Sequence, residues 1–577
     1  MSKFVLGFVV GLIASVVIGV VFILVAMWLS GKKAPIADGS TLLLHLEGDL
    51  PEQAPVVLPL PFLESQQPLT MLDIWKVLRN AAADSRIKAV MLEPQNLSAG
   101  WAKLEEVRSD IQEFKKSGKP VYAYLHSAGA HEYYAATAAD FIAMSDQDEL
   151  DVKGLRAELM YFKGTLDKLG IDMEFEHIGK YKDAPDQYTR TSPTPETLEV
   201  ENQILDQYFG DLVNTIAQGR KKAPEDVRAE IDDGPFVGQD AVKAGFIDAL
   251  LYEDQAFDQL KDKAKLDEIK KVDERDYATV PASSVGLEGK SKIAFVVGEG
   301  DITRGGTGDT ASSDEGITST SMVRLLKQVQ NDSSILGVIL RIDSPGGDGI
   351  ASDDILHQAK ALAEKKPLVI SMSDLAASGG YFIAATGDPI VAYPNTLTGS
   401  IGVFFGKPNL KGLFEKIGVT EDTLKRGRYA AIDTAFAPLS PDERAKLRTE
   451  IDKFYAGFVQ RVSAARKRPY DQIDAIAQGR VWTGEQGRKN GLVDELGGID
   501  RAIEMIKQRA KIPAGEKITL VPYPPRRSVW DVLLNHTDAD AEIESRIRSK
   551  LGIRKLPMHA LFEGGMLALM PFTIEVK

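Results

Sequence analysis

The sequence predicts an α/β protein built from two tandem copies of one fold, preceded by one membrane-spanning helix. Three observations predict this. The amino-terminal region holds a long uncharged apolar run, and the rest of the chain repeats itself at a spacing near 247 residues. Each copy also alternates short apolar strands with amphipathic helices, a pattern typical of α/β units around a largely parallel sheet.

The apolar run covers residues 4–29, which are 26 residues without a charge, bounded by Lys3 and by Lys32 and Lys33. At about 1.5 Å per residue a helix of this length exceeds the roughly 30 Å hydrocarbon core of a bilayer. We therefore expect residues 1–33 to form a transmembrane anchor. A cleaved signal peptide is the alternative, but its apolar region is usually about 7–15 residues long. Lysines at both ends leave the orientation open.

The repeat rests on matches that occur in the same order in both copies. Asp84–Leu92 (DSRIKAVML) matches Asp332–Leu340 (DSSILGVIL) at an offset of 248, and Thr194-Pro-Glu matches Ser440-Pro-Asp at an offset of 246. These matches predict a first copy over residues 34–270, a polar linker over 271–290 and a second copy over 291–515. Residues 516–577 form a tail of unknown role.

Within the first copy, the pattern predicts a strand over 88–92, a helix over 101–116 and a strand over 120–125. In the second copy, a helix is expected after Ser440, because Pro441 and Glu443 complete a capping box. Thr194 and Pro195 begin the equivalent helix of the first copy.

Composition excludes several kinds of chemistry. With 44% apolar and 26% charged residues the chain is globular, and with no cysteine it has no disulfide, thiolate zinc site, iron–sulfur cluster or cysteine nucleophile. A net charge of −14 disfavours nucleic acid as a partner. Only seven histidines are present, so catalysis is expected to depend mainly on Ser, Lys, Asp or Glu.

The two copies differ where chemistry is expected. The second copy has Ser344-Pro345-Gly346-Gly347 between a predicted strand and a predicted helix, whereas the first copy has Glu93-Pro-Gln-Asn-Leu at that place. A glycine pair in such a turn lets backbone N–H groups face a cleft, where they can stabilise an oxyanion. A simple tight turn is the alternative, but a turn needed only for folding is expected in both copies.

Two serines of the second copy have no counterpart in the first: Ser378 in A-A-S-G-G-Y and Ser400 in L-T-G-S-I-G-V. Either could be a nucleophile, and a serine needs a base within hydrogen-bond reach. The nearest histidine, His357, falls inside a predicted helix. Lys182 of the first copy aligns with Ala430 of the second. This complementary loss indicates one composite site, with a lysine as the base.

These motifs, together with Tyr181-Lys-Asp-Ala, resemble those of the signal peptide peptidase A family in its long, duplicated form, also called protease IV. This is serine peptidase family S49, of the Clp-protease and crotonase superfamily. The resemblance covers nearly the whole chain from the anchor to about residue 510.

The resemblance implies a fold of two tandem Clp-protease/crotonase-like repeats and a Ser–Lys dyad. Ser400 would be the nucleophile and Lys182 the general base, with the oxyanion hole formed by the amides of Gly347 and Ile401. No metal or other cofactor is implied. The substrates would be cleaved signal peptides left in the membrane, and the enzyme a homotetramer in the bacterial inner membrane with its catalytic region facing the periplasm.

Three other interpretations remain open. Ser378 lies 31 residues after Gly347, which is the spacing of a Clp-type nucleophile, but such an enzyme needs a later histidine and residues 378–535 contain none. A crotonase-like acyl-CoA enzyme would use the oxyanion hole without a serine nucleophile. A catalytically inactive membrane scaffold is the third.

Overall fold

The structure is a computed structural model that describes residues 36–54, 68–305, 316–525 and 565–570. The anchor predicted over residues 1–33 lies outside these ranges. Within them, no helix combines the length and the apolar character that crossing a bilayer requires.

The first copy is built around a parallel sheet with the strand order β10-β1-β2-β3-β5-β9. Its strands are β1 (Ser40–Gly48), β2 (Ile87–Leu97), β3 (Val121–Leu125), β5 (Phe141–Met144), β9 (Ala249–Leu250) and β10 (Lys270–Asp273), with β4 (Ala128–Gly129), β6 (Glu149–Asp151) and β8 (Phe236–Val237) in a small second sheet. Its helices are α2 (Met71–Ala83), α3 (Trp101–Lys115), α4 (Ala130–Ala136), α5 (Lys163–Leu169), α6 (Asp186–Thr189), α7 (Pro195–Arg220), α8 (Pro224–Asp233), α9 (Gln239–Lys243), α10 (Glu253–Ala264) and α11 (Glu274–Tyr277).

The second copy repeats this plan around a sheet with the order β20-β18-β16-β14-β11-β22. Its strands are β11 (Ser291–Glu299), β14 (Ile335–Ser344), β16 (Leu368–Ala377), β18 (Leu397–Gly399), β20 (Val481–Thr483) and β22 (Ile518–Tyr523), and β17 (Ile390–Ala392) and β21 (Glu495–Leu496) join beside β16. Its helices are α12 (Ser319–Asn331), α13 (Gly349–Ala363), α14 (Gly379–Ala384), α15 (Lys411–Ile417), α16 (Pro441–Arg466), α17 (Tyr470–Asp474), α18 (Gly484–Asn490) and α19 (Ile499–Arg509).

The strands and helices predicted within the two copies are present. β2, α3 and β3 fall on the three predicted segments of the first copy. Ser440 caps α16 with a complete capping box, and Thr194 caps α7 through the amide of Thr197. The duplication is confirmed by the shared order, in which β10 beside β1 corresponds to β22 beside β11.

The stretch 271–290, expected as a linker, contributes to the first copy instead of only joining the two. Residues 270–273 form the edge strand β10, α11 follows, and a 3-10 turn spans Ala282–Val285. Tyr277 is fully buried and donates a hydrogen bond of 2.9 Å to Asp84. The start of this stretch is polar because β10 is an edge strand, and its outer side faces solvent. The start of the tail is likewise part of the second sheet, as β22.

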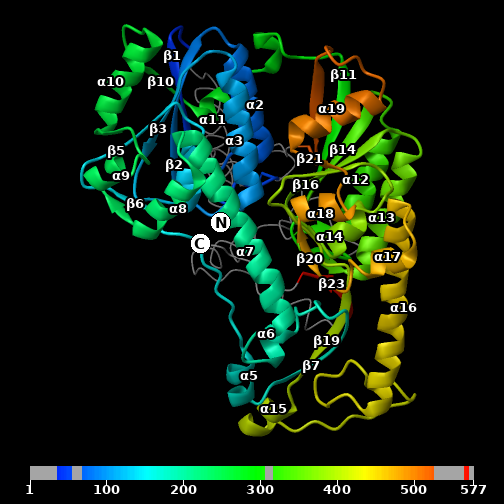
Figure 1. Cartoon of the computed structure of the whole chain (residues 1–577). Helices are drawn as coiled ribbons and strands as arrows, with labels where there is room; N and C mark the ends of the chain where they lie inside the picture. Colours follow the sequence, from blue (N-terminus) through cyan, green and yellow to red (C-terminus); the bar gives the residue numbers. More distant parts are fainter. Residues whose placement is uncertain (1–35, 55–67, 306–315, 526–564, 571–577) are drawn as a thin grey trace, which may run out of the picture.

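A third sheet joins the two copies, in the order β13-β12-β15-β23-β19-β7. Its additional strands are β7 (Asp172–Ile178) from the first copy and β12 (Ile302–Thr303), β13 (Ile317–Thr318), β15 (Gly346–Asp348), β19 (Val403–Asn409) and β23 (Gly565–Leu569) from the rest of the chain. β7 and β19 pair antiparallel from Val403↔Ile178 to Asn409↔Asp172. Figure 1 shows the two copies side by side, with α5, β7, β19 and α15 extending below them as an arm.

A buried ionic cluster also fixes the copies to each other. The Arg341 guanidinium on β14 is fully buried and donates to Glu52 at 2.7 Å, and also to Glu106 on α3. Lys103 of α3, also buried, lies 2.8 Å from Asp343. Buried charges are tolerated only when paired, so this cluster specifies one docking geometry between the copies.

Candidate active site

The cross-copy pairing of β7 with β19 brings Lys182 to the second copy. β7 ends at Ile178 and the chain turns at Gly179, whose φ of 102° suits glycine. A Cβ at Gly179 would lie 2.3 Å from the carbonyl carbon of Gln478, so the close approach requires glycine. Tyr181 N–H then donates to Gln478 O at 2.9 Å. Lys182 is thereby held beside Gly479, just before β20.

The Lys182 ammonium group lies between the two serines that the first copy lacks. Nζ is 2.8 Å from Ser378 Oγ and 3.0 Å from Ser400 Oγ, and it also donates to the Ser400 carbonyl at 3.2 Å. All three side chains are fully buried. The structure therefore brings together the lysine and both candidate nucleophiles at the interface of the copies, as complementary loss predicted.

Burial sets the acid–base behaviour of this lysine. Desolvation lowers the pKa of Lys182 to about 7, against a smaller opposing effect of the Asp183 charge. A lysine with a pKa near 7 is about half neutral at neutral pH and can accept a proton. The base therefore needs no histidine. His357, the alternative base, is exposed on α13.

Ser378 stands at a sharp turn between a strand and a helix. β16 ends at Ala377, Ser378 adopts φ 54° and ψ −112°, and α14 begins at Gly379. A positive φ is costly for a non-glycine residue and is retained where surrounding structure enforces it. This strand–serine–helix geometry is that of a nucleophile elbow, which presents a hydroxyl at the end of a parallel sheet.

Ser400 also has a positive φ, of 48°, directly after β18. Its N–H donates to Arg480 O at 2.7 Å, and its carbonyl and hydroxyl oxygens both contact Lys182. Ile401, the next residue, is buried in the core of the second copy, and its carbonyl accepts from Gly479 N–H at 2.8 Å. Ser400 thus offers the Lys182 ammonium group two acceptors, its carbonyl oxygen and its hydroxyl oxygen.

The glycine pair packs against the residue that follows Ser378. A Cβ built on Gly379 would lie 3.0 Å from Gly347 N, and one built on Gly346 would lie 2.6 Å from Gly379 N. Gly346 and Gly347 have φ of 103° and 151°, which side chains rarely adopt. The backbone of the glycine pair therefore lies directly against the backbone of Gly379.

Sequence reasoning missed two buried carboxylates behind the lysine. Asp183 accepts a hydrogen bond from Thr197 on α7, and desolvation raises its pKa to about 6. Glu201, one turn further along α7, has its pKa raised by burial to about 8. The signal available was Asp183 itself, an acidic residue next to the aligned lysine in Tyr181-Lys-Asp-Ala.

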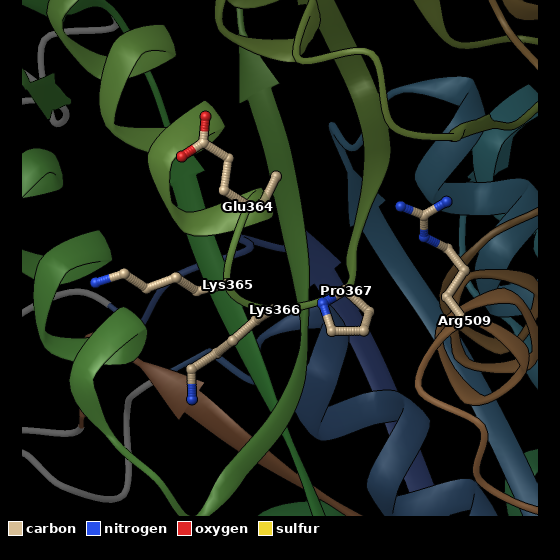
Figure 2. Close-up of a pocket in the computed structure, with 6 residues that line it drawn as sticks. Glu364, Lys365, Lys366, Pro367 and Arg509 are labelled. Carbon is tan, nitrogen blue, oxygen red and sulfur yellow. The ribbon is translucent and has the colours of Figure 1, made fainter.

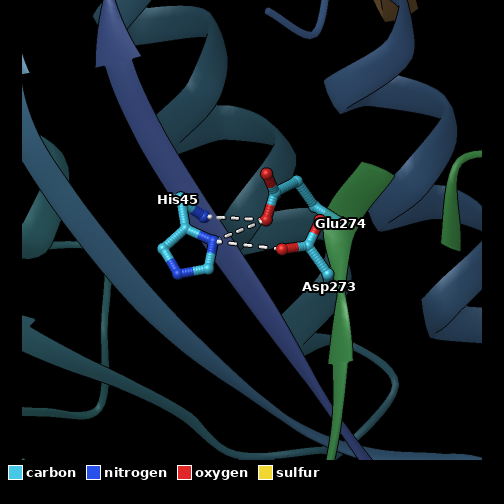
Figure 3. Close-up of side chains that lie close together, drawn as sticks. All are labelled: His45, Asp273 and Glu274. Carbon is cyan, nitrogen blue, oxygen red and sulfur yellow. Dashed lines mark hydrogen bonds and ion pairs between the residues drawn. The ribbon is translucent and has the colours of Figure 1, made fainter. Parts of the chain in front are cut away.

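Two other features lie away from this site. A hollow lined by residues 363–367 and Arg509 opens at the start of β16 (Figure 2), whereas Ser378 follows the end of that ten-residue strand, roughly 30 Å away. On β1, His45 Nδ1 lies 2.7 Å from Glu274 and 3.9 Å from Asp273 (Figure 3). Hydrogen bonds to Glu274 and Glu93 raise the pKa of His45 to about 10, so it is an ion-paired cation without a free lone pair for a metal.

Comparison with known proteins agrees with the duplicated architecture. Residues 113–267 and 360–513 each match the model of "Peptidase family S49". The chain is 35% identical to "Serine protease SPPA, chloroplastic" of Arabidopsis thaliana over 86% of this chain and 73% of that protein. It is 31% identical to "Protease 4" of Haemophilus influenzae over 87% of this chain and 85% of that protein. A structure of ClpP1 from Listeria monocytogenes, 15% identical, covers 36% of this chain and 91% of its own, with a TM-score of 0.22.

Proposed function

The chain belongs to peptidase family S49 and is a serine peptidase, and from this premise we propose that it cleaves peptides with a Ser–Lys pair to which each copy contributes one member. The lysine is Lys182 and the nucleophile is Ser400. The observation that carries the proposal is the position of the buried Lys182 Nζ, 3.0 Å from Ser400 Oγ and 2.8 Å from Ser378 Oγ, at the interface of the copies.

Neutral Lys182 takes the proton from the Ser400 hydroxyl as Oγ attacks the peptide carbonyl carbon. The carbonyl oxygen becomes an oxyanion, which the amides of Gly347 and Ile401 stabilise. Lys182 then gives its proton to the leaving amine, and the acyl group remains on Ser400 as an ester. Water, deprotonated by the same lysine, hydrolyses the ester and restores the serine.

Ser378 is the alternative nucleophile. It stands at a strand–helix turn, its Oγ lies 2.8 Å from Lys182 Nζ, and the glycine pair packs against the residue that follows it. Lys182 contacts both serines, so either could give it a proton. In the proposed mechanism Ser378 is a positioning residue for the lysine.

The test is to compare Ser378→Ala with Ser400→Ala in cleavage of a hydrophobic signal-like peptide by detergent-solubilised protein. We expect Ser400→Ala to lose at least about 10³-fold in kcat. Ser378→Ala should keep measurable activity and change its pH profile, because the lysine loses one hydroxyl acceptor. Retained activity in Ser400→Ala together with loss in Ser378→Ala would move the nucleophile to Ser378.

The natural substrates are proposed to be cleaved signal peptides and other hydrophobic peptides. An uncharged run over residues 4–29 supports a membrane anchor, and the name of a relative from Enterococcus faecium, "Putative signal peptide peptidase SppA", supports the substrate class. We propose that the oligomer is a homotetramer. Assembly is supported by large apolar side chains that are exposed on and near the arm: Met160, Leu169, Ile417, Val419 and Leu424. Placement of the catalytic region in the periplasm, at a bacterial inner membrane, stays part of the proposal.

A further inference from the structure

Arg480 lies next to both members of the proposed Ser–Lys pair without belonging to it. The residue stands just before β20, and its backbone carbonyl accepts the Ser400 N–H at 2.7 Å. Its guanidinium carbon lies 4.5 Å from the centre of the Tyr181 ring, and Tyr181 directly precedes Lys182. One residue of the second copy thus contacts both the neighbour of the base and the backbone of the nucleophile.

The Arg480 guanidinium also reaches helix α7 of the first copy, which runs between the two copies in Figure 1. It donates to Glu199 Oε1 at 2.6 Å and to Gln203 Oε1 at 2.7 Å, two residues that are one helical turn apart. The other carboxylate oxygen of Glu199 accepts from the Tyr181 hydroxyl at 3.2 Å. Arg480, Glu199 and Tyr181 therefore contact one another in pairs and form a closed triangle across the interface.

A second aromatic ring fixes the guanidinium further. Its carbon also lies 4.5 Å from the centre of the Trp482 ring, and the Arg480 side chain is only 9% exposed. A planar guanidinium suits this position, because it stacks on aromatic faces while its fixed fork of donors binds two acceptors. A lysine in its place would carry the charge but could not make both kinds of contact at once.

The backbone beside Arg480 is packed directly against the base. Gly479 has a φ of 77°, and a Cβ built on it would lie 2.6 Å from Lys182 Cβ. The Gly479 N–H donates to Ile401 O at 2.8 Å. A shift of this segment would therefore move Lys182 and the residues around Ser400 relative to each other.

We propose that Arg480 is a positioning residue for cleavage, which holds Lys182 and Ser400 at hydrogen-bond distance across the two copies. The proposal rests on the proposed function, because it takes these two residues as the base and the nucleophile. Arg480 acts through its contacts with Tyr181 and with the Ser400 backbone, and not through the peptide. Its loss should therefore lower kcat and leave KM unchanged.

The first test measures initial-rate cleavage of a hydrophobic peptide by Arg480→Met and Arg480→Lys across about pH 5.5 to 10, with rates expressed per folded protein. We expect Arg480→Met to lower kcat about 10²-fold, because a displacement of about 1 Å at a reacting group can cost this much. Arg480→Lys should lose about tenfold. The acidic limb of Arg480→Met should move to higher pH, because water that reaches Lys182 weakens the desolvation that lowers its pKa.

Arg466→Met is the matched control. Arg466 on α16 is 10% exposed and ion-paired with Asp494, so its burial and pairing equal those of Arg480, but it bonds to Gly491 and Asp494 and not to the pair. We expect this variant to keep the kcat and the acidic limb of the wild type. The proposal is overturned if Arg480→Met keeps the wild-type kcat, or if its activity falls only with its folded fraction and the limb does not move.

The second test is a double-mutant cycle with Tyr181→Leu and Arg480→Met. If both residues act through one contact, the double variant should be about as slow as the slower single variant. Losses that multiply would show that Arg480 does not act through Tyr181, and would overturn the proposal. Ser400→Ala in the same assay separates the two proposals: full activity there contradicts the proposed function, whereas an inactive Ser400→Ala beside an unimpaired Arg480→Met contradicts only the role of Arg480.

Discussion

The pH dependence of cleavage follows from the burial of Lys182 and can be worked out in numbers. A shift of the Lys182 pKa from 10.5 to about 7 amounts to roughly 4–5 kcal/mol against the charged form. With a pKa of about 7, about a tenth of the lysine is neutral at about pH 6 and about nine tenths at about pH 8. The kcat/KM of the free enzyme should therefore rise about tenfold between these two pH values and level off above about pH 8.

The same shift affects stability. In the folded chain the lysine binds its proton more weakly than in the unfolded chain, so the unfolded state holds more protons between about pH 7 and pH 10.5. The free-energy cost of burying the charged lysine is full below about pH 7 and is lost as the pH rises to about 10.5. Lys182→Met, which removes the charge, should therefore raise the free energy of unfolding more at about pH 6 than at about pH 10.

The assay is initial-rate cleavage of a hydrophobic peptide across about pH 5.5 to 10, with chemical denaturation of wild type and Lys182→Met at about pH 6 and pH 10. Lys182→Arg is the control. Its guanidinium remains protonated over this whole range, so the variant should be inactive at every pH. A profile that is flat over this range, or that is still rising at about pH 10, would refute a buried lysine with a lowered pKa as the base.

Three further outcomes are expected. Asp183→Asn should move the acidic limb of the profile to lower pH, because the Asp183 charge raises the pKa of Lys182, whereas Asp186→Asn, three residues further on, should leave that limb in place. Gly347→Ala should lower kcat, measured at saturating peptide, by about 10²–10³-fold. The new Cβ would lie 2.1 Å from Ile302 O and would displace the amide that is proposed to donate to the oxyanion. An unchanged kcat would remove this amide from the mechanism. Arg341→Met should cost about 3–5 kcal/mol in denaturant unfolding because it leaves two buried carboxylates unpaired, and a loss below about 1 kcal/mol would contradict that role.

Much of the fold was predictable because the sequence contains the same pattern of strands and helices twice. The repeat allowed the two copies to be aligned, and the capping boxes and strand patterns located α7, α16, β2, α3 and β3. These are local signals, in which a residue and its near neighbours determine the element. The polar stretch 271–290 was misleading because an exposed edge strand such as β10 has the composition of a linker.

The composite site was predictable only in part. Comparing the copies singled out Lys182, Ser378, Ser400 and Gly347, which all lie at the interface. The contact of Lys182 with both serines was not accessible from the sequence, because it depends on the tertiary pairing of β7 with β19. The return of β23 was also beyond sequence reasoning, since pairing between segments more than 150 residues apart leaves no periodic signal.

The pairing of β7 with β19 has a consequence for the order in which the chain becomes active during synthesis. Translation delivers the lysine first and the serines about two hundred residues later, and the burial that lowers the lysine pKa exists only after the second copy has docked. Before then the lysine is an ordinary solvated cation and no hydroxyl lies beside it. In the proposed mechanism, a partly synthesised chain therefore cannot hydrolyse its neighbours, because the base, the nucleophile and the oxyanion donors come together only when the two copies dock.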